Sequence, residues 1–99
     1  MAEVARHGLC VPAGHPVFAG HFPDAPLVPA VMLLAAVAEA LAAERGQVLG
    51  GVREAKFLAP LLPDVAAEVT LEALDTRRTR FLIRTLEAVI ARGIVEGAA

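Results

Sequence analysis

The chain has 99 residues, enough for one domain with a single hydrophobic core and too few for several. Hydrophobic residues make up 57% of it, and the formal net charge of -2 gives no general attraction for nucleic acid. The single cysteine, Cys10, excludes a disulfide within the chain and argues against a zinc cluster.

The mean hydropathy of +0.61 is high for a small soluble domain. A small globule cannot hide this much apolar surface, so we expect an oligomer interface or an apolar ligand channel. Residues 1–12 lack the apolar core of a secretory signal, and the longest apolar run, residues 25–38, is short and interrupted by prolines. We therefore expect a cytoplasmic protein with no membrane span, and we expect no cofactor and no metal.

The first half of the chain predicts a strand, a loop and a helix. Residues 4–11 favour a strand, and the stretch from residue 12 to residue 29 has five prolines and two glycines, typical of a loop. Pro29 suits the start of a helix over residues 30–45, and Gly46 follows where a C-cap glycine belongs.

The predicted helix has an unusual composition. Residues 30–38 contain no polar side chain, and charge begins only at Glu39. A helix that is apolar on every face is normally buried on every face. We therefore expect its first two turns to be interior and its carboxyl end to reach solvent.

The second half of the chain predicts strands. Residues 65–73 alternate with a period of two, as a half-exposed strand does. Residues 47–58, 80–87 and 88–95 are further candidate strands, and residues 75–79 form a polar hairpin connection. A sheet with one solvated face must cover the other. The fold class is therefore α+β, with an antiparallel sheet wrapped around the helix.

The segment before the helix carries a candidate site. His21 lies in the sequence Gly20-His21-Phe22-Pro23, a few residues before the helix start. An imidazole titrates near neutral pH and can remove a proton beside a carbonyl. The N–H groups and dipole of a helix N-terminus can stabilise the negative charge that develops.

These residues resemble the hotdog-fold 3-hydroxyacyl-[acyl-carrier-protein] dehydratases. That family shows a Gly-His-Phe-Pro loop, a Pro-Gly-Val helix start, an acid inside the helix, and a later K-F-x-x-P-x-x-P segment. The matching residues here are Gly20-His21-Phe22-Pro23, then Pro29 and Val31, then Lys56, Phe57, Pro60 and Pro63. The resemblance implies a single hotdog domain over residues 1–99, with its sheet around one long central helix.

The resemblance also implies roles for individual residues. His21 would be the general base and acid, and backbone N–H groups of Gly20 and Ala30 would contact the thioester carbonyl. The acyl group would lie along Phe22, Val31, Leu34 and Ala35. Paired sites at a dimer interface would draw on two subunits, in a homodimer, a heterodimer with a related hotdog subunit, or a higher oligomer.

Two positions depart from the family pattern. Ala30 stands where the helix-start glycine belongs, and Ala35, fourteen residues after His21, stands where the helix acid belongs. Alanine cannot transfer a proton. Glu39, one turn further along the helix, and Asp24, in the loop, are the candidate replacements. Their ordinary roles would be a solvated or interface charge and a turn residue.

Three functions remain open. The first is an active dehydratase of acyl thioesters on acyl carrier protein or coenzyme A, in fatty-acid or polyketide-type lipid metabolism. The second is a non-catalytic member that binds acyl chains or carrier protein, or stabilises an active relative. The third is a heterodimer in which this chain lends His21 and a partner lends the missing acid. A hotdog thioesterase is a further enzyme option, because one fold serves several chemistries.

Several basic side chains and one further histidine complete the candidate residues. Docking of an acidic carrier protein would use Arg53, Lys56, Arg78 and Arg80. The alternative is an ordinary solvated face of strands and turns. His15, which precedes Pro16, is expected to position the loop.

Overall fold

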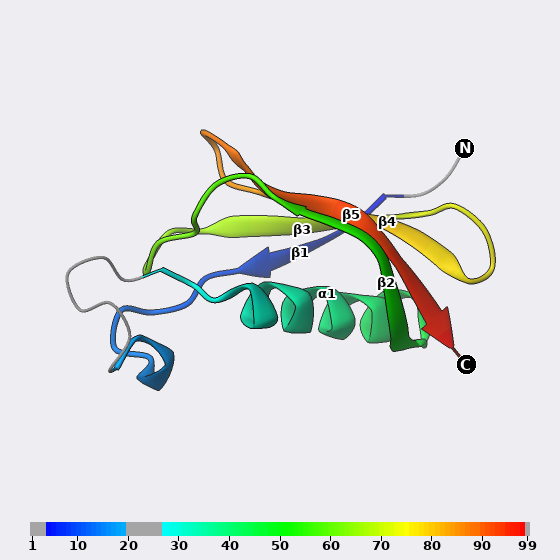
Figure 1. Cartoon of the computed structure of the whole chain (residues 1–99), viewed down its shortest axis with the longest axis horizontal. Helices are drawn as coiled ribbons and strands as arrows, with labels where there is room; N and C mark the ends of the chain where they lie inside the picture. The colour runs from blue at the N-terminus through cyan, green and yellow to red at the C-terminus, as the bar shows by residue number, and fades with distance from the viewer. Residues whose placement is uncertain (1–3, 20–26, 99) are drawn as a thin grey trace.

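A computed structural model describes residues 4–19 and 27–98, which form one antiparallel sheet and one long helix (Figure 1). The sheet has five strands in the order β1-β3-β4-β5-β2, so β1 and β2 are its edges. Figure 1 shows the helix lying along one face of the sheet. The elements are β1 (Val4–Leu9), the 3-10 turn η1 (Pro16–Phe18), α1 (Ala30–Arg45), β2 (Val48–Phe57), β3 (Ala67–Ala73), β4 (Arg78–Arg84) and β5 (Val89–Ala98).

The core lies between the sheet and α1. Alternate residues of β3, β4 and β5 point toward the helix and are buried, as the period-two pattern predicts. Leu33, Val37 and Leu41 meet them from the helix. A side chain at Gly93 would overlap the Glu54 carbonyl and the Phe81 ring, so this position of β5 admits only glycine. The predicted α+β arrangement of a sheet over one helix is confirmed.

The helix begins and ends where the sequence predicts, but it buries only one face. Its last residue is Arg45, and Gly46 follows in the left-handed region with φ 63°. Val31 is 72% exposed, and Ala35 and Glu39, at successive four-residue steps, are exposed as well. The prediction that the first two turns are interior on every side is therefore wrong for the single chain. One sheet can cover only one side of a helix.

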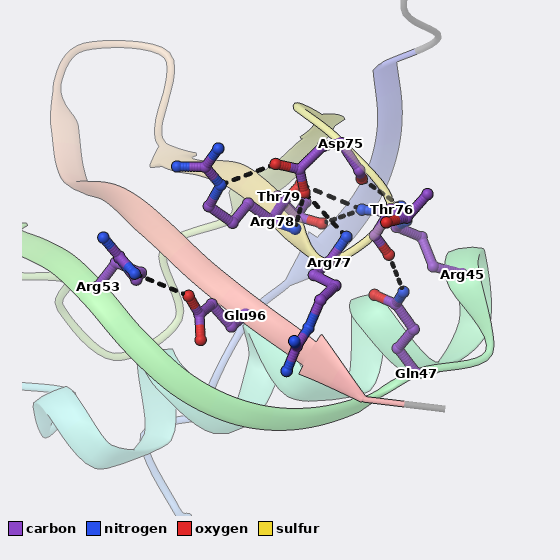
Figure 2. Close-up of polar contacts among 9 residues, drawn as sticks. All are labelled: Arg45, Gln47, Arg53, Asp75, Thr76, Arg77, Arg78, Thr79 and Glu96. Atoms are coloured by element: carbon purple, nitrogen blue, oxygen red, sulfur yellow. Dashed lines mark hydrogen bonds and ion pairs between the residues drawn. The ribbon is translucent and has the colours of Figure 1, made fainter.

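A polar network fastens the carboxyl end of α1 to the β3–β4 hairpin (Figure 2). The Arg45 guanidinium donates to the carbonyls of Asp75 and Arg78 and to the hydroxyl of Thr79, which is fully buried. Gln47 Nε2 donates to the Thr76 carbonyl at 2.8 Å. This end of the helix is therefore held by side-chain hydrogen bonds as well as by packing.

The segments before α1 are also fixed by hydrogen bonds. His15 Nδ1 accepts from the Val17 N–H at 3.0 Å and so caps η1, which agrees with its predicted role in positioning the loop. The Val28 N–H donates to the Leu61 carbonyl at 2.8 Å and ties the entry of α1 to the β2–β3 connection. Cys10, which a free cysteine's usual burial would place in the core, is exposed. In the described part of the chain, no helix combines the length and apolar character needed to cross a membrane.

Candidate functional site

The amino end of α1 presents free backbone donors. Pro29 occupies the N-cap position, where it offers no side-chain acceptor, and its carbonyl accepts from the N–H groups of Met32 and Leu33. Within residues 4–19 and 27–98, the N–H groups of Ala30 and Val31 have no acceptor. Such unpaired donors, together with the helix dipole, favour a negatively charged or strongly polarised oxygen nearby.

An apolar pocket opens at the same end of the helix. Its volume is about 330 Å³. Its floor is buried, because Leu33 is 4% and Leu61 is 1% exposed, whereas Phe57 at its rim is 47% exposed. The lining combines the entry and first turn of α1 with the end of β2 and the segment after it: Leu27, Val28, Ala30, Leu33, Phe57, Leu58, Ala59, Pro60 and Leu61. A pocket without a charged side chain suits an acyl chain.

The predicted site residues divide into three groups by their place in the structure. Gly20, His21, Phe22 and Asp24 lie outside the described residues, so their roles stay predictions. Ala30 lines the apolar pocket, and its contact with a thioester carbonyl stays a prediction. The remaining positions lie outside the pocket lining: Val31, Ala35 and Glu39 are exposed on the outward side of α1, and Leu34 is half-buried and packs against the core.

Ala35 and Glu39 can be placed relative to each other along the helix. Both lie on the exposed side of α1, where a single chain offers no partner surface. Four residues of α-helix separate their Cα atoms by about 6 Å along the axis. A carboxylate at Glu39 could therefore serve a site near Ala35 only by extending back over one full turn. Ala35, the position where the family resemblance predicts an acid, is exposed on the outer side of the helix.

Three of the four predicted docking cations are neutralised by neighbours. Arg53 pairs with Glu96 at 3.0 Å and Arg80 with Glu72 at 2.7 Å. Arg78 pairs with Asp75 at 2.8 Å, at the hairpin that Figure 2 shows. Lys56 has no carboxylate within 4.0 Å in the part of the chain that the structure describes.

Asp75 is the acid whose environment changes its titration most clearly. The backbone N–H groups of Arg78 and Arg77 donate to its carboxylate, and so does the side chain of Arg78. These donors stabilise the charged form and lower the pKa of Asp75 to about 2. This carboxylate orders the β3–β4 hairpin, far from the helix start, and we assign it a structural role.

Sequence reasoning missed the residues that build the pocket wall. Leu27 and Leu61 were not candidates, although Leu61 lies inside the matched Lys56–Pro63 segment, and that segment was the available signal. The Arg45 network also had no sequence signal, because its acceptors are mostly backbone carbonyls. No group of three His, Cys, Asp or Glu side chains that could hold a metal occurs among the described residues.

Residues 2–94 match the family model described as ApeI-like, ApeI dehydratase. The chain belongs to the ApeI-like dehydratase family. It is also 33% identical over 78 residues to the 3-hydroxyacyl-[acyl-carrier-protein] dehydratase FabZ of Haemophilus influenzae, a match that covers 69% of this chain and 53% of that protein. The chain thus spans about half the length of the curated relatives it matches. The predicted resemblance to these dehydratases is confirmed.

Solved structures show the same fold. One chain of the dehydratase heterocomplex ApeI:P from Xenorhabdus doucetiae superposes with a TM-score of 0.84 at 20% identity, covering 97% of this chain and 88% of that one. The fluoroacetyl-CoA thioesterase FlK superposes with a TM-score of 0.67 at 23% identity, covering 98% and 84%. The predicted hotdog fold is confirmed, and both kinds of enzyme share it.

Proposed function

We propose that this chain is a 3-hydroxyacyl thioester dehydratase subunit that works in a two-subunit site. The observation that carries the proposal is the N–H of Ala30, which has no acceptor among the described residues and lies at the edge of an apolar pocket. A thioester whose carbonyl accepts from this N–H would place its acyl chain against apolar walls. Burial of each methylene there would stabilise binding by about 0.8 kcal/mol.

The proposed reaction removes water across C2 and C3 of the substrate. His21 would take the C2 proton, while the N–H groups of Ala30 and Gly20 stabilise the negative charge on the thioester oxygen. The C3–O bond would then break, and an acid would supply the proton that turns the leaving hydroxide into water. Phe22, Val31 and Leu34 would border the acyl group on the side toward the second subunit.

A second subunit would complete this site. The exposed stripe of α1 carries Val31 and Ala35, and Val48 on the edge strand β2 is 68% exposed. Apolar surface on one side of the helix and along a free sheet edge favours a partner of the same fold. Such a partner would also bury the first turns of α1 that the single chain leaves open.

The identity of the partner decides where the acid comes from. In a homodimer, the first carboxylate after Ala35 along α1 is Glu39, one turn away. In a heterodimer, a related hotdog subunit would supply the acid that Ala35 lacks. Two considerations favour the heterodimer: an alanine stands at the acid position, and a solved relative is described as a heterocomplex. The alternative is a non-catalytic subunit that binds acyl groups or carrier protein and pairs with an active relative.

The test is turnover of 3-hydroxyacyl thioesters, on coenzyme A and on carrier protein, with dehydration and thiol release followed separately. We expect Ala35→Glu to raise dehydration by about a hundredfold or more, because one acid of a two-residue site is worth that much. Ala42→Glu, the same change at another exposed position of α1, is the matched control and should have no effect.

His21→Ala separates the remaining cases. If wild type dehydrates the substrate and His21→Ala does not, the chain is an enzyme with an acid from Glu39, which Glu39→Gln would then abolish. If activity needs a co-purified relative, the heterodimer is correct. Thiol release without dehydration would identify a thioesterase and would contradict the proposal.

A further inference from the structure

A second cavity opens at the carboxyl end of α1, between the helix and strands β1 and β3, and we call it the carboxyl-end cavity. Its volume is about 550 Å³. Leu71 and Thr79 form a buried inner wall, whereas Val4 and Ala73 at the mouth are exposed. The described residues that line it include none of those that line the pocket at the amino end. Binding in this cavity would therefore be separate from the proposed dehydration.

Small side chains leave this space open. Ala5 on β1 stands directly opposite Leu71 on β3, and Ala73 is the last residue of β3, so both alanines come where the sheet leaves the helix. The preceding residues of β3 on the same face, Val69 and Leu71, are larger and are buried. The walls that remain are apolar and suit a short aliphatic chain.

Arg45 and Thr79 add hydrogen-bond donors to these apolar walls. A guanidinium carries five N–H groups, and those of Arg45 donate to the carbonyls of Asp75 and Arg78 and to the Thr79 hydroxyl (Figure 2). Two N–H groups of Arg45 and the hydroxyl proton of Thr79 have no acceptor among the residues that the structure describes. A buried donor without an acceptor is costly, so an oxygen ligand that accepts several hydrogen bonds would be favoured here.

The two charged residues of the lining differ in their partners. Oε1 of Glu44 lies 2.9 Å from Nε2 of His7, so this carboxylate is directed toward β1. Arg45 has no carboxylate within 4.0 Å in residues 4–19 and 27–98. The carbonyls at the end of a helix are unfavourable for an anion, so the charge of Arg45 is what would attract one.

We propose that the carboxyl-end cavity binds a monocarboxylic acid with a short apolar chain. The carboxylate would accept from the remaining N–H groups of Arg45 and from the Thr79 hydroxyl, and the opposite charge of the guanidinium strengthens such bonds. The chain would lie along Val4, Ala5 and Leu71, which gives the ligand contacts with the edge strand β1 as well as with α1.

The first experiment measures binding of butanoate, hexanoate, hexanol and hexylamine to the purified chain by isothermal titration calorimetry at neutral pH. Hexanoate should bind about tenfold more tightly than butanoate, because two more methylenes are buried. Hexanol should bind about tenfold more weakly than hexanoate, because it lacks the charge that faces Arg45. Undetectable binding of hexanoate, or equally tight binding of hexylamine, would overturn the proposal.

The second experiment locates the ligand, because the pocket at the amino end of α1 is apolar too. Ala5→Leu fills the carboxyl-end cavity and should weaken hexanoate binding by about tenfold. Ala59→Leu is the matched control, a half-buried alanine that lines the other pocket, and it should bind hexanoate as wild type does. Ala73→Leu makes the same change at the exposed mouth and keeps the test available if Ala5→Leu does not fold. Binding that is lost in Ala59→Leu and kept in the other variants would overturn the proposal.

A third variant, Glu44→Gln, tests the charge of the ligand. Removal of this negative charge from the cavity wall should strengthen hexanoate binding by about threefold, because a repulsion between two carboxylates is lost. An amine held by Glu44 would instead bind more weakly to this variant. Hexanoate affinity that is unchanged or weaker in Glu44→Gln would contradict a carboxylate bound beside Arg45.

Discussion

The two ends of α1 are built in opposite ways. At the carboxyl end, Gly46 turns the chain back, and Arg45 and Gln47 donate to the β3–β4 hairpin. At the amino end, Pro29 supplies no side-chain cap, and the N–H of Ala30, beside an apolar pocket, has no acceptor in the part of the chain that the structure describes. The carboxyl end of α1, which we call the closed end, fixes the helix on the sheet, and the amino end is called the open end. The amino end keeps the donors and apolar surface that the proposed chemistry on a thioester would require.

This difference predicts which property, folding stability or activity, a substitution at each end of α1 will affect. Removing a polar group from the closed end should cost folding stability and leave the chemistry of the open end intact. Removing the donor from the open end should do the reverse, because nothing in the described fold depends on that N–H. Substitutions that fail to follow this division would show that the two ends are coupled.

The largest effect is expected from Ala30→Pro, which deletes one N–H. Proline is favoured at the first position of a helix, and the extended conformation of Pro29 (φ -62°, ψ 149°) tolerates a following proline. The free energy of unfolding should therefore change by less than about 0.5 kcal/mol. Dehydration by wild type, or by Ala35→Glu, should fall by about a hundredfold, because an oxyanion donor is lost.

Ala30→Gly keeps the N–H and serves as the control for this prediction. It removes the methyl that crowds the pocket and should retain activity. Dehydration by Ala30→Pro at the level of Ala30→Gly would show that the helix N-terminus is not the oxyanion site.

The next effect is expected at the closed end, from Arg45→Met. This change keeps the aliphatic stem but leaves the buried Thr79 hydroxyl without its donor. Loss of a partner to a buried polar group costs about 2 kcal/mol, which urea denaturation can measure. Arg53→Met is the matched control, since the exposed Arg53–Glu96 pair should be worth less than about 1 kcal/mol. Equal losses in both variants would contradict the assigned role of Arg45.

A smaller loss is expected from Gly46→Ala. A Cβ added at Gly46 would meet no atom within 4 Å, so the whole effect comes from the left-handed conformation. The free energy of unfolding should fall by about 1 kcal/mol in the same urea assay. Because the pocket lies at the other end of α1, kcat for the thioester substrate should stay unchanged. A fall in kcat would reveal coupling between the ends.

The smallest effect concerns pH. The pKa of Asp75 falls from its ordinary value of 3.8 to about 2 in the folded chain, so the folded state favours the carboxylate. The stabilising contribution is therefore complete above about pH 4 and is lost as the pH falls toward 2. Asp75→Asn can still accept from the N–H groups of Arg77 and Arg78, and it should unfold with a weaker pH dependence in that window. Identical acid profiles would refute this assignment.

The sequence predicts the elements well because each has a local signal. The helix over residues 30–45 and its glycine cap follow from Pro29, Gly46 and the run of helix formers, and the structure confirms both ends. The strand over residues 65–73 follows from its alternation and is observed from Ala67 to Ala73. The observed strand begins two residues later than predicted, because Asp64 adopts a positive φ of 64° in the turn just before it.

The environment of the helix could not be predicted in the same way. The sequence does not show whether an apolar residue faces the sheet, a pocket or a second subunit, so it does not distinguish Leu33 from Val31. One is 4% and the other 72% exposed. The hydrogen bonds of Arg45 could not be predicted for a different reason. Their acceptors lie about thirty residues further along the sequence. The Gly20–Pro23 motif gives a chemical prediction that only activity measurements can test.

The edge strand β2 has a further consequence for the behaviour of the protein in concentrated solution. Its pairing with β5 shifts register between Leu49 and Gly51 and again between Val52 and Glu54, so Gly50 and Arg53 are extra residues that bulge from the ladder. Bulges twist a strand and interrupt the regular row of donors and acceptors at its open edge. A partner shaped to these irregularities can still pair with β2, whereas flat strands of misfolded chains cannot add to it one after another. The same ten residues that we propose as an association surface thus resist fibrillar stacking.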